Sequence, residues 1–184
     1  DILINNSDVG EVYLVIIAHI VLDKSRVLIN ADAVETAGYT GLHQTACVID
    51  TGIDYTHPAL GGCFGATCKV RGGWNYDNGS GIPMDETNHG TLVAGIIASE
   101  DTKIRGISPG ARLVAMRVCN SAGTNCPSDD IVRALQYCYN NRNIYNISVV
   151  SISLGNSTEY TTNNCPSTAK TEVNDLYSVG IPTI

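Results

Sequence analysis

Residues 45–60 read TACVIDTGIDYTHPAL, and this stretch decides the fold class. Its first six residues, Thr45–Asp50, form a short apolar run that stops at Thr51-Gly52, a pair typical of a turn. The run therefore predicts a buried strand with Asp50 at its carboxyl end. Sites in open α/β sheets lie beyond the carboxyl ends of the strands, so Asp50 is a candidate site residue.

The rest of the chain alternates between strand and helix patterns. Apolar residues follow a helical spacing over 89–98, and a second helix is predicted to start near Pro127 with Ser128 as its N-cap. Residues 61–83 are rich in glycine and show no period, which predicts an irregular surface region. The remaining predicted elements are strands at 112–118, at 146–154 and from Ile181 onward, and a weaker helix at 166–177.

This alternation predicts an α/β fold, a parallel sheet with helices on both faces. Because Ile181 begins an apolar strand that the sequence does not finish, we expect the sheet to be incomplete at the C-terminus. The 184 residues suit one domain, and 43% hydrophobic with 16% charged residues favours a globular core over disorder. The formal net charge of −7 argues against nucleic-acid binding, which needs an excess of lysine and arginine.

His89 opens the first predicted helix in the string NHGTLVAGIIA. A histidine that acts as a general base needs a carboxylate at its second ring nitrogen, which fixes the tautomer and stabilises the imidazolium. Asp50 and His89, on separate elements with glycines beside them, are two parts of such an Asp-His-Ser system. No serine of the 184 stands in a suitable turn, so we expect the nucleophile outside this stretch.

Four strings resemble motifs of the subtilisin-like serine proteases (subtilases, peptidase S8 family), over about residues 29–184. VIDTGIDYTHPAL resembles the family's aspartate motif, PMDETNHGTLVAGI its histidine motif, GISPGARLVAMRV the strand after that helix, and ISLGN the substrate-binding strand. The resemblance implies a subtilisin-like fold and a serine endopeptidase that acts on polypeptides. It implies Asp50 as the catalytic aspartate and His89 as the general base, with no cofactor required for the chemistry.

The resemblance also implies where a substrate binds. One set of residues lines one side of the pocket for the side chain before the scissile bond. A second set forms the opposite edge, to which an extended peptide adds as a strand. The implied pocket residues are Ser153, Leu154 and Gly155, and the implied edge residues are Gly123, Thr124 and Asn125.

Two positions depart from the family pattern. Leu92 stands where the family usually has a second histidine, and Asn88 stands where it usually has a glycine. We expect Leu92 to pack in the core and Asn88 to adopt a positive φ, which asparagine tolerates. Asp85 and Glu86 are candidate ligands of a structural calcium ion, since related enzymes use surface carboxylates in this way.

Residues 1–28 precede the part that resembles the family. We interpret them as a remnant of an inhibitory propeptide or as an N-terminal extension, and 29–184 as the N-terminal part of the catalytic domain. Val12–Leu22 is strongly apolar, but its eleven residues are too few for a membrane span, which needs about 20. A buried strand fits this stretch best.

Seven cysteines are many for a chain of this length. Cys63 and Cys68 bracket one glycine-containing turn, and such short loops close with good disulfide geometry. Cys119 and Cys126 bracket another. Zinc is the competing interpretation, but it favours closer cysteine pairs with further ligands, and no histidine lies in either loop. The two predicted disulfides imply an oxidising compartment, so we expect an extracellular or secreted protein, or one associated with the cell envelope.

The other cysteines lack a bracketing turn. Cys47 lies inside the first apolar strand, where we predict a buried free thiol that packs as a small hydrophobic side chain. A further pair between Cys138 and Cys165 is compatible with the sequence, although nothing local fixes it.

Three other functions compete with the protease hypothesis. An aspartic protease also carries an apolar run before Asp-Thr-Gly, but it is all-β, and serine or threonine is expected where Ile53 stands. A phosphate-accepting aspartate at a strand end would leave His89 and the cysteines unexplained. The third alternative is a subtilase fold that has lost catalysis and persists as a binding module, and the presence of both Asp50 and His89 argues against it.

Overall fold

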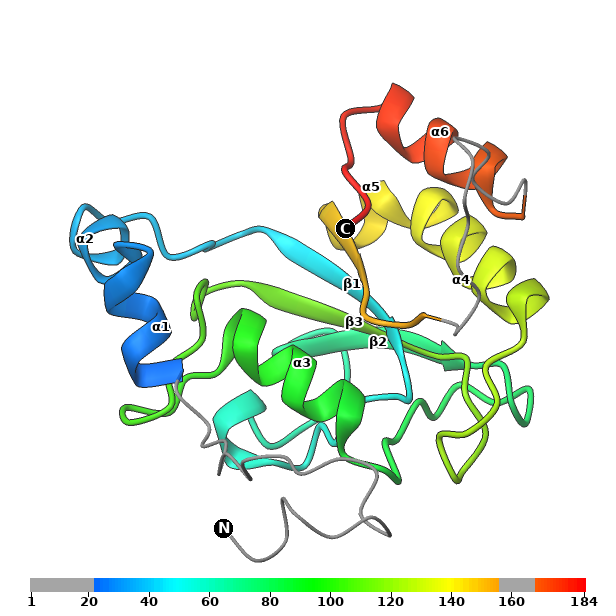
Figure 1. The fold of residues 1–184 in the computed structure, drawn as a ribbon, viewed down its shortest axis with the longest axis horizontal. Coiled ribbons are helices and arrows are strands. Elements are labelled where there is room, and N and C mark those ends of the chain that lie inside the picture. The colour runs from blue at the N-terminus through cyan, green and yellow to red at the C-terminus, as the bar shows by residue number, and fades with distance from the viewer. Residues whose placement is uncertain (1–21, 156–167) are drawn as a thin grey trace, which may run out of the picture.

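The computed structural model describes residues 22–155 and 168–184, and its centre is a four-stranded parallel sheet (Figure 1). The strand order β2-β3-β1-β4 places β1 between β3 and β4, and all three pairings are parallel. The strands are β1 (Thr45–Asp50), β2 (Val70–Asn75), β3 (Arg112–Arg117) and β4 (Ile147–Ile152).

Helices cover both faces of this sheet, which confirms the predicted α/β architecture. α3 (His89–Ala98) packs on one face, and α4 (Ser128–Asn140) with α6 (Lys170–Ser178) packs on the other (Figure 1). The shorter helices are α1 (Leu22–Leu28), α2 (Ala31–Thr36), the 3-10 helix η1 (Pro58–Leu60) and α5 (Arg142–Tyr145).

The middle strand β1 contributes to two cores at once, because successive side chains of a strand point to opposite faces. Cys47 and Ile49 pack with Leu135 of α4. Ala46 and Val48 pack in the second core, with the small residues of α3. All six residues of β1 are buried, so neither face of the strand is exposed to solvent.

The C-terminal residues extend the sheet beyond β4. The Val150 N–H donates to the Pro182 carbonyl at 2.9 Å, and the Ile184 N–H donates to the Val150 carbonyl at 3.0 Å. A further bond runs from the Ile152 N–H to the Ile184 carbonyl at 2.8 Å. The predicted strand that starts near Ile181 therefore pairs in parallel with the free edge of β4.

Residues 61–83 contain β2, so the prediction of a wholly irregular region was wrong. The strand reads VRGGWN, and its residues alternate in burial instead of forming an apolar run. Gly73 has a φ of 154°, and a Cβ there would lie 1.9 Å from the Ala115 carbonyl oxygen of β3. Glycine is required here because the two backbones approach each other closely. Since glycine has no apolar side chain, the segment did not show the sequence pattern of a buried strand.

Element boundaries differ from prediction by a few residues. Ser128 is the first residue of α4, with Pro127 at the N-cap and no side-chain cap, so the predicted Ser128 cap was wrong. Asn146 has a φ of 55° at the end of α5, and β4 begins after it. The predicted helix at 166–177 corresponds to α6, which begins at Lys170, while residues 156–167 lie outside the described residues.

The orientation of α3 corrects the expectation for Leu92. Small residues, Gly90, Ala94 and Ala98, face the sheet, so the helix approaches it closely. Leu92 lies on the outer side and is 58% exposed, so the prediction that it packs in the core was wrong. With Ile96 and residues from other segments it lines an apolar groove of about 850 Å³.

Three disulfides are present among the described residues. Cys63–Cys68 and Cys119–Cys126 form as predicted. The third joins Cys47 of β1 to Cys138 of α4, so the predictions of a free Cys47 thiol and of a Cys138–Cys165 pair were wrong. Both residues are fully buried on the α4 side of the sheet, where the packing of α4 on β1 brings them together. Closing a loop of this length stabilises a fold by about 4–5 kcal/mol in the chain-entropy picture.

The N-terminal described segment is tied to the rest of the fold through Arg26. This side chain, on α1, is buried, forms ion pairs with Asp32 at 2.7 Å and Glu35 at 2.6 Å, and donates to the Gly106 carbonyl. No described helix has the length and apolar character needed to cross a membrane. The predicted buried strand at Val12–Leu22 lies outside the described residues, apart from Leu22, which begins α1.

Candidate active site

Asp50 is the last residue of β1, and its side chain is fully buried at the carboxyl edge of the sheet. Its Oδ1 accepts a hydrogen bond from the Thr51 N–H at 2.7 Å and lies 2.7 Å from Nδ1 of His89. Its Oδ2 has no hydrogen-bond partner among the described residues. Among the described residues, His89 is therefore the side chain that forms a hydrogen bond with this buried carboxylate.

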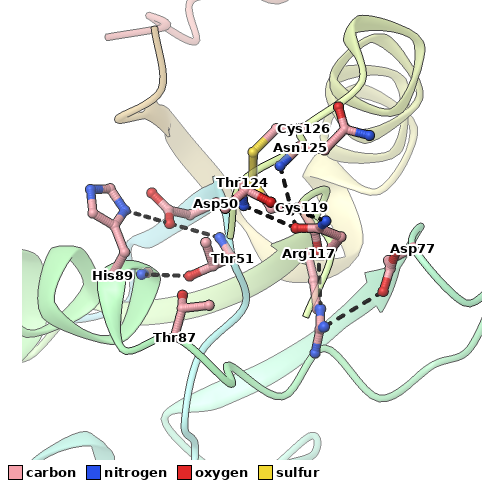
Figure 2. Close-up of a disulfide and its surroundings, with 12 residues drawn as sticks. Asp50, Thr51, Asp77, Thr87, His89, Arg117, Cys119, Thr124, Asn125 and Cys126 are labelled. Atoms are coloured by element: carbon pink, nitrogen blue, oxygen red, sulfur yellow. Dashed lines mark hydrogen bonds and ion pairs between the residues drawn. A yellow bond between two sulfur atoms is a disulfide. The ribbon is translucent and has the colours of Figure 1, made fainter. Parts of the chain in front are cut away.

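His89 is the first residue of α3, and Figure 2 shows its ring turned toward Asp50. The preceding residue, Asn88, has a φ of 73°, as predicted, and this turn directs the chain into the helix. Nδ1 faces the carboxylate, while Nε2 points away from it, and the side chain is 53% exposed (Figure 2). The arrangement suits a base whose outer nitrogen is available to a second group.

Two glycines allow the aspartate loop and α3 to meet. Gly52 has a φ of 106°, and a Cβ there would lie 2.6 Å from the Pro83 carbonyl oxygen. A Cβ on Gly90 would lie 2.1 Å from the Gly52 carbonyl oxygen and 3.1 Å from Oδ1 of Asp50. The Gly90 N–H also donates to the Thr51 hydroxyl at 2.9 Å. The absence of side chains at these positions is what lets His89 reach Asp50.

Gly90→Ala is expected to destabilise the fold by about 1–3 kcal/mol, because the added methyl group would push α3 away from β1 and the loop that follows it. Gly95→Ala is the matched control, since a Cβ at that position of the same helix meets nothing within 4 Å. That control is expected to be neutral or to stabilise by up to about 1 kcal/mol. Denaturant unfolding measures both changes, and equal effects at the two positions would refute the close-approach argument.

A second carboxylate, Asp85, organises the loop that leads to His89. Its Oδ1 accepts from the Thr51 hydroxyl, from the Thr87 N–H and hydroxyl, and from the Asn88 N–H, at 2.9–3.1 Å. Its Oδ2 accepts from the Thr91 N–H at 2.9 Å and from the Thr91 hydroxyl at 2.6 Å. Asp85 thus caps the N-terminus of α3 and links it to the loop after Asp50.

These bonds determine the ionisation of Asp85. Burial alone would raise its pKa, but the hydrogen bonds from Thr91, Thr87 and Thr51 outweigh that effect and hold the pKa below the ordinary value of 3.8. The folded state therefore favours the ionised carboxylate more than the unfolded state does. The resulting stabilisation is fully present above about pH 3.8 and is lost as the pH falls toward the lowered pKa.

Asp85→Asn is expected to destabilise the protein by about 1–3 kcal/mol near neutral pH, because an amide nitrogen would face the donors of Thr91. The difference from the unchanged protein should shrink below about pH 3.8. Asp129→Asn, at a carboxylate that is 79% exposed, is the control. Thermal unfolding at several pH values measures the effect, and a difference that stays constant down to about pH 3 would contradict the assignment.

Arg117 is a residue that sequence reasoning did not single out. It ends β3, directly opposite Asp50 in the strand pairing, and is 3% exposed. Its guanidinium donates to the Met84 carbonyl at 2.8 Å, to the Glu86 carboxylate at 2.8 Å and to the Cys119 carbonyl at 3.2 Å. It therefore joins the loop before His89 to the loop after β3. The sequence feature that could have identified Arg117 is its position as a charged residue at the end of an apolar strand.

The residues predicted to bind substrate follow the two strands that flank β1. Ile152 pairs with Ile49, so the segment after β4 leaves the sheet beside Asp50. The loop after β3 leaves on the other side, where the Val118 N–H donates to the Asp50 carbonyl at 2.9 Å. The strand order thus puts both predicted segments at the edge that carries Asp50: Ser153, Leu154 and Gly155 after β4, and Gly123, Thr124 and Asn125 after β3. Their role with a substrate stays a prediction.

The predicted calcium ligands have other partners. Both oxygens of Asp85 accept hydrogen bonds from the protein, and Glu86 forms an ion pair with Arg117. Within 22–155 and 168–184, no group of three or more His, Cys, Asp or Glu side chains is placed to hold a metal ion. The residues at this position therefore do not fit a calcium site.

Comparison with known proteins identifies the family of this chain. The sequence model of the subtilase family, Peptidase_S8, matches residues 42–180. A thermophilic serine proteinase of Bacillus sp. (strain AK1) is 40% identical over 123 residues, which is 65% of this chain and 27% of the relative. Subtilisin E of Bacillus subtilis (strain 168) is 35% identical over 156 residues, which is 83% of this chain and 36% of the relative.

A solved structure extends the similarity to the fold. The structure of sphericase superposes with a TM-score of 0.59 at 26% identity, covering 78% of this chain and 45% of sphericase. The chain thus spans less than half of the length of each of these three proteins. Because the family model covers most of the chain and includes both Asp50 and His89, the chain belongs to the subtilase family.

Proposed function

We propose that this chain supplies the aspartate and histidine of a serine endopeptidase that hydrolyses peptide bonds by acyl transfer. The observation that carries the proposal is the 2.7 Å contact between the buried Asp50 carboxylate and Nδ1 of the half-exposed His89. In this proposal the nucleophilic serine, and an asparagine that binds the oxyanion, belong to a part of the protein outside these 184 residues. Family membership supports the reaction class.

Each residue has a defined part in the proposed reaction. Asp50 accepts a hydrogen bond from the protonated Nδ1 of His89, which leaves Nε2 unprotonated and facing outward. Nε2 takes the hydroxyl proton as the serine oxygen bonds to the substrate carbonyl carbon. It then gives that proton to the amine as the C–N bond breaks, and a water molecule releases the acyl group by the same steps. Asp50 stabilises the transient imidazolium throughout.

The proposed substrate is an extended polypeptide. It would pair along Gly123, Thr124 and Asn125 as an added strand and place one side chain beside Ser153, Leu154 and Gly155. The location of both segments at the edge that carries Asp50 supports this path. We also propose an extracellular or secreted protein, or one at the cell envelope, and three disulfides support an oxidising compartment. Residues 1–28 are proposed as a propeptide remnant that acts on the same site.

Assay of the complete protein on denatured protein substrates tests the proposal. We expect hydrolysis that a serine-directed phosphonate inhibitor abolishes, with the inhibitor recovered on one serine by mass spectrometry. A complete protein that binds peptides but neither cleaves them nor reacts with the phosphonate would favour the alternative of a catalytically dead binding module. Cleavage that the phosphonate leaves untouched would also refute the serine mechanism.

A further inference from the structure

The predicted peptide-binding edge is carried by a covalently closed loop. Cys119 and Cys126 form a disulfide with Cα atoms 4.1 Å apart and a sequence separation of 7. Cys119 lies two residues after β3 and is fully buried, while Cys126 lies two residues before α4. The disulfide therefore fastens the two ends of the loop to two rigid elements (Figure 2).

Hydrogen bonds inside the loop add a second constraint. The Asn120 carboxamide oxygen accepts from the Thr124 N–H at 2.9 Å and from the Asn125 N–H at 3.3 Å. The backbone of Asn120 also pairs with the Asn125 carbonyl at 3.0 Å and with the Gly123 N–H at 2.9 Å. Thr124 and Asn125 are thereby held in one conformation although both are exposed.

The loop is also fixed relative to His89. Gly123 has a φ of 68°, and a Cβ there would lie 3.0 Å from Cγ2 of Thr87, two residues before His89. Arg117 donates from the same guanidinium to the Cys119 carbonyl and to the Met84 carbonyl of the histidine loop. The base of the loop is therefore linked through Arg117 to the segment that precedes His89, and Gly123 lies close to Thr87 of that segment.

A short polar loop with exposed tip residues would otherwise be the mobile part of this edge. Ordering such a loop when a peptide binds lowers affinity, and ordering it beforehand removes that penalty. We propose that the Cys119–Cys126 disulfide, with Asn120, is a positioning device that holds the edge at Gly123–Asn125 in its peptide-binding conformation. The proposal rests on the proposed function, and it assigns the disulfide to substrate affinity as well as to folding.

The chain offers a matched control in Cys63–Cys68. That disulfide also closes a short loop, with a sequence separation of 5, and none of the candidate site residues lies within it. Its removal should change stability by a comparable amount without altering the peptide-binding edge. A merely structural role for Cys119–Cys126 would make the two removals equivalent.

The test uses the complete protein with Cys119→Ser/Cys126→Ser and with Cys63→Ser/Cys68→Ser. We expect the first pair to raise KM about tenfold for a peptide long enough to pair with the edge, with kcat changed by less than about twofold. A small ester that does not reach the edge should show no change in KM. The second pair should leave KM unchanged for both substrates. Equal KM values in the two variants would overturn the inference.

Two further measurements keep the outcome decisive if the double-serine variant folds poorly. Asn120→Ala leaves the disulfide in place and removes the side-chain bonds to the Thr124 and Asn125 N–H groups, so it should also raise KM for the long peptide. Amide hydrogen exchange at 123–125 should accelerate in this variant, and protection equal to that of the unchanged protein would refute the positioning role. A complete protein that cleaves no peptide before any substitution would instead refute the proposed function.

Discussion

Replacing His89 with alanine in the complete protein is expected to lower kcat/KM for peptide hydrolysis by about four orders of magnitude or more. The reason is geometric, since His89 is the described side chain that contacts Asp50 and also presents a free ring nitrogen at the edge of the sheet. Its loss removes the acceptor for the serine proton and the donor for the leaving amine. Steady-state kinetics on a peptide with a chromogenic leaving group measures the change.

His43→Ala is the matched control for this substitution. His43 is exposed and precedes the amino end of β1, so it lies at the opposite edge of the sheet from Asp50. Its replacement should leave kcat/KM within about twofold. Circular dichroism should show both variants folded, because half-exposed His89 makes little contact with either core. A His89→Ala protein with normal turnover would eliminate the assignment of the base.

Asp50→Asn is expected to reduce kcat by about 10⁴-fold with a much smaller change in KM. An asparagine keeps the size of the side chain, but the Oδ1 position faces both the Thr51 N–H and Nδ1 of His89 and holds only one group of the amide. With the nitrogen there, the amide donates to Nδ1 and gives up the bond from Thr51, which favours the tautomer with the proton on Nε2 and blocks that nitrogen as a base. The variant also loses the charge that stabilises the imidazolium.

The pH profile distinguishes this effect from a loss of fold. A tautomer defect should be partly relieved at high pH, where hydroxide can replace the histidine as the acceptor of the serine proton. A variant that is merely misfolded would show low activity at every pH and a lowered unfolding temperature. Activity of Asp50→Asn equal to that of the unchanged protein would show that the carboxylate does not act through His89.

The parts of the fold that the sequence predicts best are those buried on both sides. β1 is an apolar run because two cores cover it, whereas α3 packs on the sheet through the small residues Gly90, Ala94 and Ala98. The contact between Asp50 and His89 followed from their positions at a strand end and a helix start. Elements whose identity depends on a neighbour were harder to predict.

The incorrect predictions about the fold have definite physical causes. β2 pairs at the edge through glycines, so its strand character arises from β3 and not from its own side chains. The Cys47–Cys138 disulfide spans 91 residues and depends on how α4 packs on β1, which no local spacing records. Leu92 is exposed because Gly90 and Ala94 set the rotation of α3.

The same reasoning applies to the site. Asp85 was a candidate calcium ligand because related enzymes use surface carboxylates in this way, whereas its oxygens accept hydrogen bonds from threonines and backbone N–H groups that the fold brings together. Arg117 was overlooked because its partners, the Met84 and Cys119 carbonyls and the Glu86 carboxylate, come from two separate loops. Both residues act through contacts that exist only after the sheet has formed.

Alkylation by a peptidyl chloromethyl ketone is the most direct measurement of whether a bound peptide meets His89, the proposed general base. A ring nitrogen that faces the bound peptide displaces the chloride and forms a stable N–C bond that mass spectrometry locates. In the complete protein we predict a single adduct on His89, at Nε2, and its suppression by excess substrate. An adduct on His43 or His57 instead, in a protein that cleaves peptides, would contradict the pairing of Asp50 with His89 as the acid–base centre.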